Sequence, residues 1–207
     1  MKTIHARISV LALCMALLLL AGCASTAKKT SRFYVLSPMA GIETAKQVVS
    51  AGTGNISISI GPISLPKYLR KSQIVTRTGN NELHLAEFDR WAGKIEEDIG
   101  RVIAENLTNL LSTDKVLTYP AIGALDTDYR IEMGISMFEG RLGESVELIT
   151  RWAIFDIQGK TVKNITSTRI TEPVQGSSYA DMVAAQSRIL ASLSRELADA
   201  IIQLPGK

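Results

Sequence analysis

The chain has 207 residues, of which 46% are hydrophobic and 21% charged, and its formal net charge is +3. This length suits one globular domain with a substantial core. The small net charge argues against a nucleic-acid partner, which requires a strongly basic domain or patch.

Residues 1–22 are predicted to be a cleaved lipoprotein signal peptide. Lys2 and Arg7 precede an apolar stretch, residues 8–20. Its roughly 13 residues fit the apolar region of a secretory signal, whereas a transmembrane helix needs about 20. The stretch ends in Leu20-Ala21-Gly22-Cys23, where small residues precede a cysteine. We therefore expect cleavage before Cys23 and its acylation, in preference to an ordinary signal cut elsewhere. Loss of the two leader cations lowers the formal charge from +3 to +1.

Residues 23–31 are predicted to be the acylated cysteine and a flexible tether. Two or more acyl chains on Cys23 would hold the protein on a bilayer, because each buried CH₂ contributes about 0.8 kcal/mol. The eight residues after it are small or polar, and fully extended they reach about 28 Å. The remaining residues, 32–207, form a single expected periplasmic domain without cysteine, which is compatible with an oxidising compartment.

Eight segments are predicted to be strands, because apolar and polar side chains alternate in them or turn residues bound them. Ile56, Ile58 and Ile60 alternate with small residues, for example. Pro62 and Pro66 predict an extended bend. Turns are expected at residues 79–81 and 158–160. In chain order the predicted strands are 32–36, 55–62, 73–78, 82–86, 116–118, 128–138, 146–157 and 161–171.

Two long amphipathic helices complete the predicted fold. Apolar residues recur every three or four positions over residues 87–111. The second helix begins after Ser178, an N-cap with Asp181 three residues later, and ends at Pro205 and Gly206. We therefore expect an α+β fold, a two-layer sandwich in which two long helices cover one mostly antiparallel sheet.

Short motifs, none of them catalytic, occur in order along the mature chain. They are Ile58-Ser59-Ile60-Gly61-Pro62, Leu65-Pro66-Lys67-Tyr68-Leu69, Gln73-Ile74-Val75-Thr76-Arg77, Leu85-Ala86-Glu87-Phe88, Trp91, Asn106-Leu107, Phe138-Glu139-Gly140-Arg141, Trp152 and Leu204-Pro205. In this order the chain resembles the ABC-type transport auxiliary lipoproteins, the paraquat-inducible protein C family. The resemblance implies an outer-membrane lipoprotein that faces the periplasm. It also implies an MCE-domain partner anchored in the inner membrane, lipid transport between the membranes and a role in envelope integrity.

Residues typical of an active site are sparse. His84 is the only histidine of the mature chain, and no cysteine or carboxylate cluster at ligand spacing accompanies it. No serine lies in a G-x-S-x-G turn. We therefore expect a protein that is not an enzyme, without a metal or a cofactor other than the covalent acyl chains on Cys23.

Two segments are candidate partner-binding sites. The first carries Lys67, Tyr68, Arg70, Lys71 and Arg77, four cations and one aromatic residue within 11 positions. Such a basic edge is suited to an acidic partner or to anionic headgroups, although a merely solvated loop is equally compatible. The second is the segment from Phe138 to Glu144, in which an exposed Phe138 or Arg141 would anchor a contact. Its alternative is a plain hairpin turn with Phe138 in the core.

The expected function is docking of the MCE-domain protein while the acyl chains hold the domain on the inner leaflet of the outer membrane. A homo-oligomeric ring is a further hypothesis, because a hollow symmetric partner favours matching symmetry. One alternative is an assembly or plug lipoprotein for an outer-membrane barrel, similar to the lipopolysaccharide-assembly lipoproteins. The other is a stand-alone lipid carrier with an apolar cavity of about 300–1,000 Å³.

Overall fold

The computed structural model describes residues 30–39, 56–119, 127–156 and 161–204. Cys23 with the signal peptide, the turn at 158–160 and the helix stop at Pro205 lie outside these residues. From Ser31 onward the chain forms one compact unit. None of the helices in the described ranges is long and apolar enough to cross a membrane.

The larger sheet has five strands in the order β5-β2-β6-β7-β8. Strand β2 runs parallel to both β5 and β6, whereas β6, β7 and β8 are antiparallel neighbours. Pro62 lies inside β2, where the pairing register shifts between Ile60 and Ile63, so the predicted bend is an irregularity within the strand. The strands are β2 (Ile58–Ser64), β5 (Val116–Thr118), β6 (Tyr129–Gly140), β7 (Ser145–Asp156) and β8 (Val162–Pro173).

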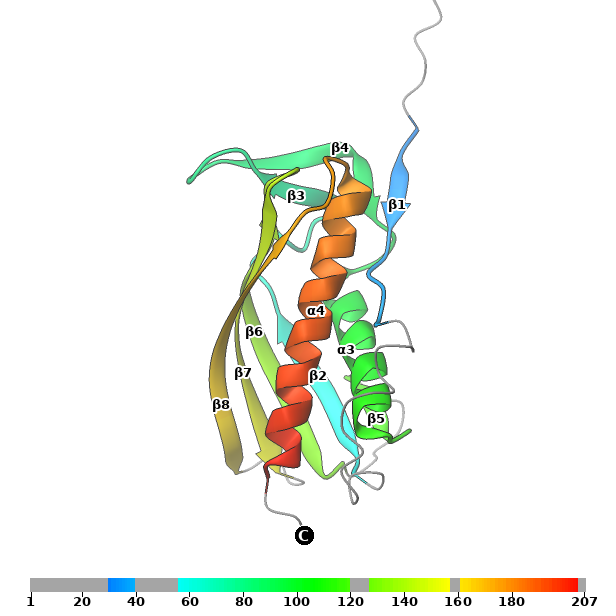
Figure 1. The fold of residues 1–207 in the computed structure, drawn as a ribbon, viewed down its shortest axis with the longest axis vertical. Coiled ribbons are helices and arrows are strands. Elements are labelled where there is room, and N and C mark those ends of the chain that lie inside the picture. Colours follow the sequence, from blue (N-terminus) through cyan, green and yellow to red (C-terminus); the bar gives the residue numbers. More distant parts are fainter. Residues whose placement is uncertain (1–29, 40–55, 120–126, 157–160, 205–207) are drawn as a thin grey trace, which may run out of the picture. The chain divides into compact units, whose positions relative to one another are not determined.

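A second, three-stranded sheet has the order β1-β4-β3 and lies at the top of Figure 1. It is formed by β1 (Arg32–Tyr34), β3 (Gln73–Arg77) and β4 (Leu83–Trp91). The predicted hairpin is confirmed, since β3 and β4 are antiparallel. The prediction of one mostly antiparallel sheet is wrong in the number of sheets: the described residues form two, and each contains parallel as well as antiparallel pairs. Local alternation marks a strand as half-buried but does not reveal its partner.

The helix predicted from residue 87 begins eight residues later, because β4 continues to Trp91 and α3 spans Ile95–Leu111. Asp89 and Trp91 are buried at alternate positions, as in a strand. Residues 89–91 also pair with β1. Partners on both sides thus hold this segment extended, although its apolar spacing suits a helix.

Helices α3 and α4 (Tyr179–Ile202) lie side by side over one face of the larger sheet (Figure 1). The predicted N-cap of α4 is confirmed, because Ser178 and Asp181 form a reciprocal capping box. Between the helices, the fully buried Asn106 accepts a hydrogen bond from the Met39 amide at 2.8 Å and donates one to Ser194 Oγ at 3.1 Å. The core is the apolar layer between the two helices and the inner face of the sheet.

Candidate partner-binding site

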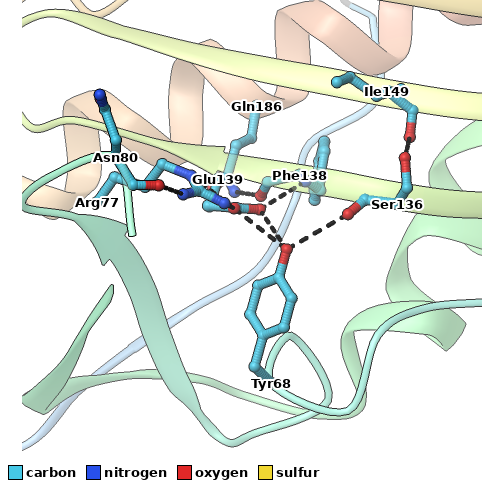
Figure 2. A network of polar contacts seen from close by, with 8 residues as sticks. All are labelled: Tyr68, Arg77, Asn80, Ser136, Phe138, Glu139, Ile149 and Gln186. Carbon is cyan, nitrogen blue, oxygen red and sulfur yellow. Dashed lines mark hydrogen bonds and ion pairs between the residues drawn. The ribbon is translucent and has the colours of Figure 1, made fainter. Parts of the chain in front are cut away.

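The two candidate segments meet around the carboxylate of Glu139 (Figure 2). Tyr68 lies in the loop between β2 and β3, and Glu139 lies near the end of β6. The Tyr68 hydroxyl is 3.2 Å and 3.3 Å from the two oxygens of Glu139, and 3.3 Å from the carbonyl oxygen of Ser136. All three atoms are acceptors, so the Tyr68 hydroxyl is the donor, and its single hydrogen is shared among them.

Arg77, the last residue of β3, forms an ion pair with the same carboxylate. Its Nε and Nη2 donate to Glu139 Oε1 at 3.0 Å and 2.8 Å, and its Nη1 donates to the Asn80 carbonyl at 3.1 Å. The Glu139 side chain has no exposed surface, whereas that of Arg77 is 24% exposed. The Phe138 amide donates to Oε2 at 2.9 Å. The buried carboxylate is therefore paired and hydrogen-bonded, as a buried charge must be.

Burial raises the pKa of the Tyr68 phenol, and the negative charge of Glu139 raises it further. The hydroxyl therefore remains protonated, and so remains a donor, at neutral pH. The result is a polar cluster, Tyr68, Arg77 and Glu139, that joins the smaller sheet and the loop after β2 to the larger sheet. We call these three residues the Glu139 cluster.

Of the basic residues of the first segment, Arg77 is part of this cluster, whereas Lys67, Arg70 and Lys71 lie in the loop that carries Tyr68. Leu65 and Leu69 are buried on either side of Tyr68, which pins the loop to the domain. The side chains of Lys67, Arg70 and Lys71 are left exposed. Within the described ranges no hydrogen bond or ion pair holds these three cations. They form a fixed basic edge.

In the second segment the side chain of Phe138 is buried, whereas that of Arg141 is accessible. Phe138 is only 1% exposed, so the prediction of an exposed Phe138 anchor is wrong and the core alternative applies. Arg141 is half-buried and lies 3.7 Å from the carboxylate of Glu144. It borders an open groove of about 360 Å³ that Arg77, Asn80 and Glu139 also line. Arg141 thus joins Lys67, Arg70 and Lys71 as the accessible cations of the site, which we call the basic rim.

A bulge in β6 explains why the sequence did not reveal the Glu139 cluster. The pairing register with β7 shifts between Ile135 and Met137. Beyond it, Phe138 is opposite the buried Leu148 and Glu139 is opposite Glu147, and directly opposed residues share a face. Phe138 therefore faces the helices and Glu139 the opposite side, where the Tyr68 loop covers it. The only local signal is that the acidic Glu139 directly follows the apolar pair Met137 and Phe138.

A tight turn and a helix contact fix the end of β6. A side chain at Gly140 would overlap the backbone of Ser145, so the turn requires glycine. Gln186 of α4 donates to the Phe138 carbonyl at 2.9 Å. The described residues contain no group of three metal-ligating side chains, and His84 is exposed. This arrangement presents cations on a rigid frame, which is suited to binding.

The fold and the site thus define an α+β domain built to hold a binding surface. Residues 34–198 match the family described as ABC-type transport auxiliary lipoprotein component, and the chain belongs to this family. The resemblance inferred from the sequence motifs is confirmed.

Relatives of similar length support the assignment. The chain is 24% identical over 191 residues to the intermembrane transport lipoprotein PqiC of Escherichia coli, covering 92% of this chain and 96% of that protein. The Shigella flexneri protein of the same name gives the same values. Two crystal structures share the fold with a TM-score of 0.67: an uncharacterized protein, at 19% identity, and XCC0632 from Xanthomonas campestris, at 13%. The match covers 83% of this chain in both cases, and 99% and 98% of the two neighbours.

Proposed function

We propose that this chain is the outer-membrane lipoprotein subunit of an MCE-type intermembrane lipid transport system. It acts by docking an MCE-domain protein that is anchored in the inner membrane, and it thereby contributes to envelope integrity. Acyl chains on Cys23 hold it on the inner leaflet, facing the periplasm. The support is family membership over residues 34–198 and a match along nearly the full length of a protein named for intermembrane transport. The role is non-enzymatic and needs no cofactor.

The docking surface in this proposal is the basic rim. The observation that carries it is the convergence of Tyr68, Arg77 and Glu139, which brings two segments about 70 residues apart into one site. Since the ion pair to the buried Glu139 and the buried loop leucines hold these segments, the backbone that carries the exposed cations is fixed before a partner arrives. Preorganisation lowers the entropy cost of binding, and four cations select an acidic surface on the partner.

A ring of several copies would give this surface the symmetry of a hollow partner. Each copy would then contribute one basic rim to a repeated contact. Light scattering of the purified lipoprotein tests this part of the proposal, because a monomer at high concentration would contradict it.

The docking surface is tested by reversing two of its charges in the full-length lipoprotein. Arg70→Glu with Lys71→Glu should lower recovery of the MCE-domain protein severalfold on co-purification and should reduce envelope resistance. The matched control is Lys115→Glu with Lys163→Glu, which makes the same change in charge at the end of the larger sheet where β6 begins, opposite the end that carries Glu139. Recovery and resistance that equal those of the control pair would contradict the assignment of the rim.

A further inference from the structure

The segment that follows the tether is firmly attached to the domain from its first residues. Arg32 forms an ion pair with the buried Asp89 at 2.8 Å, and Tyr34 donates to the same carboxylate at 2.7 Å. The Leu36 amide donates to Asp98 Oδ2 at 2.6 Å, and the Met39 amide to Asn106 Oδ1 at 2.8 Å. The predicted tether therefore ends at β1, where the chain enters the domain at a fixed point.

Along this segment the side chains alternate between the domain and solvent. Leu36 is 1% exposed and Tyr34 is half-buried, whereas Phe33 is 65% exposed and Val35 57% exposed. Two large apolar side chains thus point outward within three residues of each other. A single exposed apolar residue is ordinary on a protein surface, but adjacent ones at one edge of a sheet indicate a contact surface.

The position of this pair relative to the predicted anchor identifies its occupant. Phe33 lies ten positions after Cys23, which is about 35 Å at full extension and roughly 18 Å as a flexible coil. Between Cys23 and Phe33 the sequence carries Lys28 and Lys29, besides the Asp89-paired Arg32, and no acidic residue, and anionic headgroups attract Lys and Arg. Apolar side chains flanked by cations are the composition of an interfacial membrane contact.

We infer that β1 lies against the phospholipid leaflet that holds the acyl chains, with Phe33 and Val35 entering the interface between headgroups and acyl chains. This inference rests on the proposed lipid anchor at Cys23. A contact of Phe33 and Val35 with the leaflet that is too weak to hold an untethered domain on the membrane is sufficient here. The tether keeps the domain close to the leaflet and so raises the effective concentration of the two side chains there. The contact sets the orientation of the domain on the membrane.

The orientation leaves the proposed docking surface accessible. Strand β1 is one edge of the three-stranded sheet, and β3, which carries Arg77 of the Glu139 cluster, is the other edge. The leaflet and a protein partner therefore approach opposite edges of the same small sheet. Membrane contact and docking are compatible in one molecule.

The test is spin labelling of the full acylated lipoprotein in vesicles of phosphatidylethanolamine and phosphatidylglycerol. Since Cys23 is acylated in this proposal and Cys14 leaves with the signal, a single introduced cysteine carries the only label. The variants are Phe33→Cys and Val35→Cys, and the matched control is Ile165→Cys, which is 64% exposed on β8 of the larger sheet. The readout is the ratio of oxygen to nickel-chelate accessibility of the nitroxide.

We expect this ratio to be severalfold higher at positions 33 and 35 than at position 165. Flotation of the vesicles distinguishes failure of the β1 membrane contact from failure of the lipid anchor. A chain that floats but whose labels are all in water overturns the membrane contact and leaves the anchor intact. A chain that does not float overturns the anchor and with it this inference. Dipolar broadening between labels at position 33 or 35 assigns the surface to a second copy and also overturns it.

Discussion

At the scale of single residues, the molecule depends on one buried carboxylate that lies far in sequence from its partners. Glu139 receives hydrogen bonds from Tyr68, Arg77 and the Phe138 amide. Transfer of such a charge out of water is costly, and its partners offset that cost only while all of them are in place. The position of the basic rim therefore depends on an interaction that the rim residues do not themselves make.

Removal of this carboxylate should destabilise the domain much more than removal of an exposed one. We expect Glu139→Ala to lower the free energy of unfolding by about 3 kcal/mol, because it leaves Arg77 partly buried without its counter-ion. The control is Glu147→Ala, whose partner Arg169 is 67% exposed, and which should cost less than about 1 kcal/mol. Urea unfolding followed by circular dichroism measures both values. Equal losses in the two variants would contradict the assigned role of Glu139.

The residue types of the site could be predicted from the sequence, but the contacts among these residues could not. Spacing of cations identified Lys67, Arg70, Lys71 and Arg77, and two glycines identified the turn beyond Phe138. Which strand face Glu139 occupies depends on a bulge, and alternation gives no sign of a bulge. The meeting of two segments about 70 residues apart is a property of the folded chain alone.

At the scale of elements, the contrast between α4 and β4 shows what local sequence decides. The start of α4 could be predicted, because its capping box is a contact between residues three positions apart. The end of β4 could not, because residues 89–91 are held extended by β1. That strand begins 57 positions earlier in the chain. Local patterns therefore gave the right element types wherever the deciding contacts were local.

The attachment of β1 leads to a prediction that depends on pH. Burial, with the hydrogen bond to Asp89, raises the pKa of Tyr34 from 10.0 to about 12. Tyr34→Phe should cost about 1.5–3 kcal/mol at pH 7, because it removes a hydrogen bond to a charged group. The raised folded-state pKa means that this stabilisation is complete below pH 10 and is lost as the pH rises to about 12.

Unfolding of the wild type and of Tyr34→Phe should accordingly be compared from pH 8 to pH 12. We expect the difference in free energy between the two proteins to shrink over the upper half of this range. A constant difference at every pH would show that Tyr34 does not hold β1 through the carboxylate of Asp89.

At the scale of the whole molecule, the fold places the two proposed contact surfaces at opposite edges of one small sheet. Parallel pairing with β4 fixes where the tether enters, and the Glu139 cluster fixes the basic rim beyond β3. The α+β class and the two amphipathic helices could be predicted from periodicity. The division into two mixed sheets could not be predicted, because β2 and β6 are neighbours in the sheet but are separated in the sequence by four other elements, β3, β4, α3 and β5.

The central claim is that the basic rim docks an MCE-domain protein, and photo-cross-linking in cells tests it most directly. Photoreactive residues replace Arg70 or Arg141 in the native lipoprotein, and Lys163 on β8, at the opposite end of the larger sheet, serves as the control position. Mass spectrometry identifies what each position captures. We predict capture of an MCE-domain protein from positions 70 and 141 but not from 163. Capture of an outer-membrane barrel protein, or of lipid alone, at positions 70 and 141 would contradict the account.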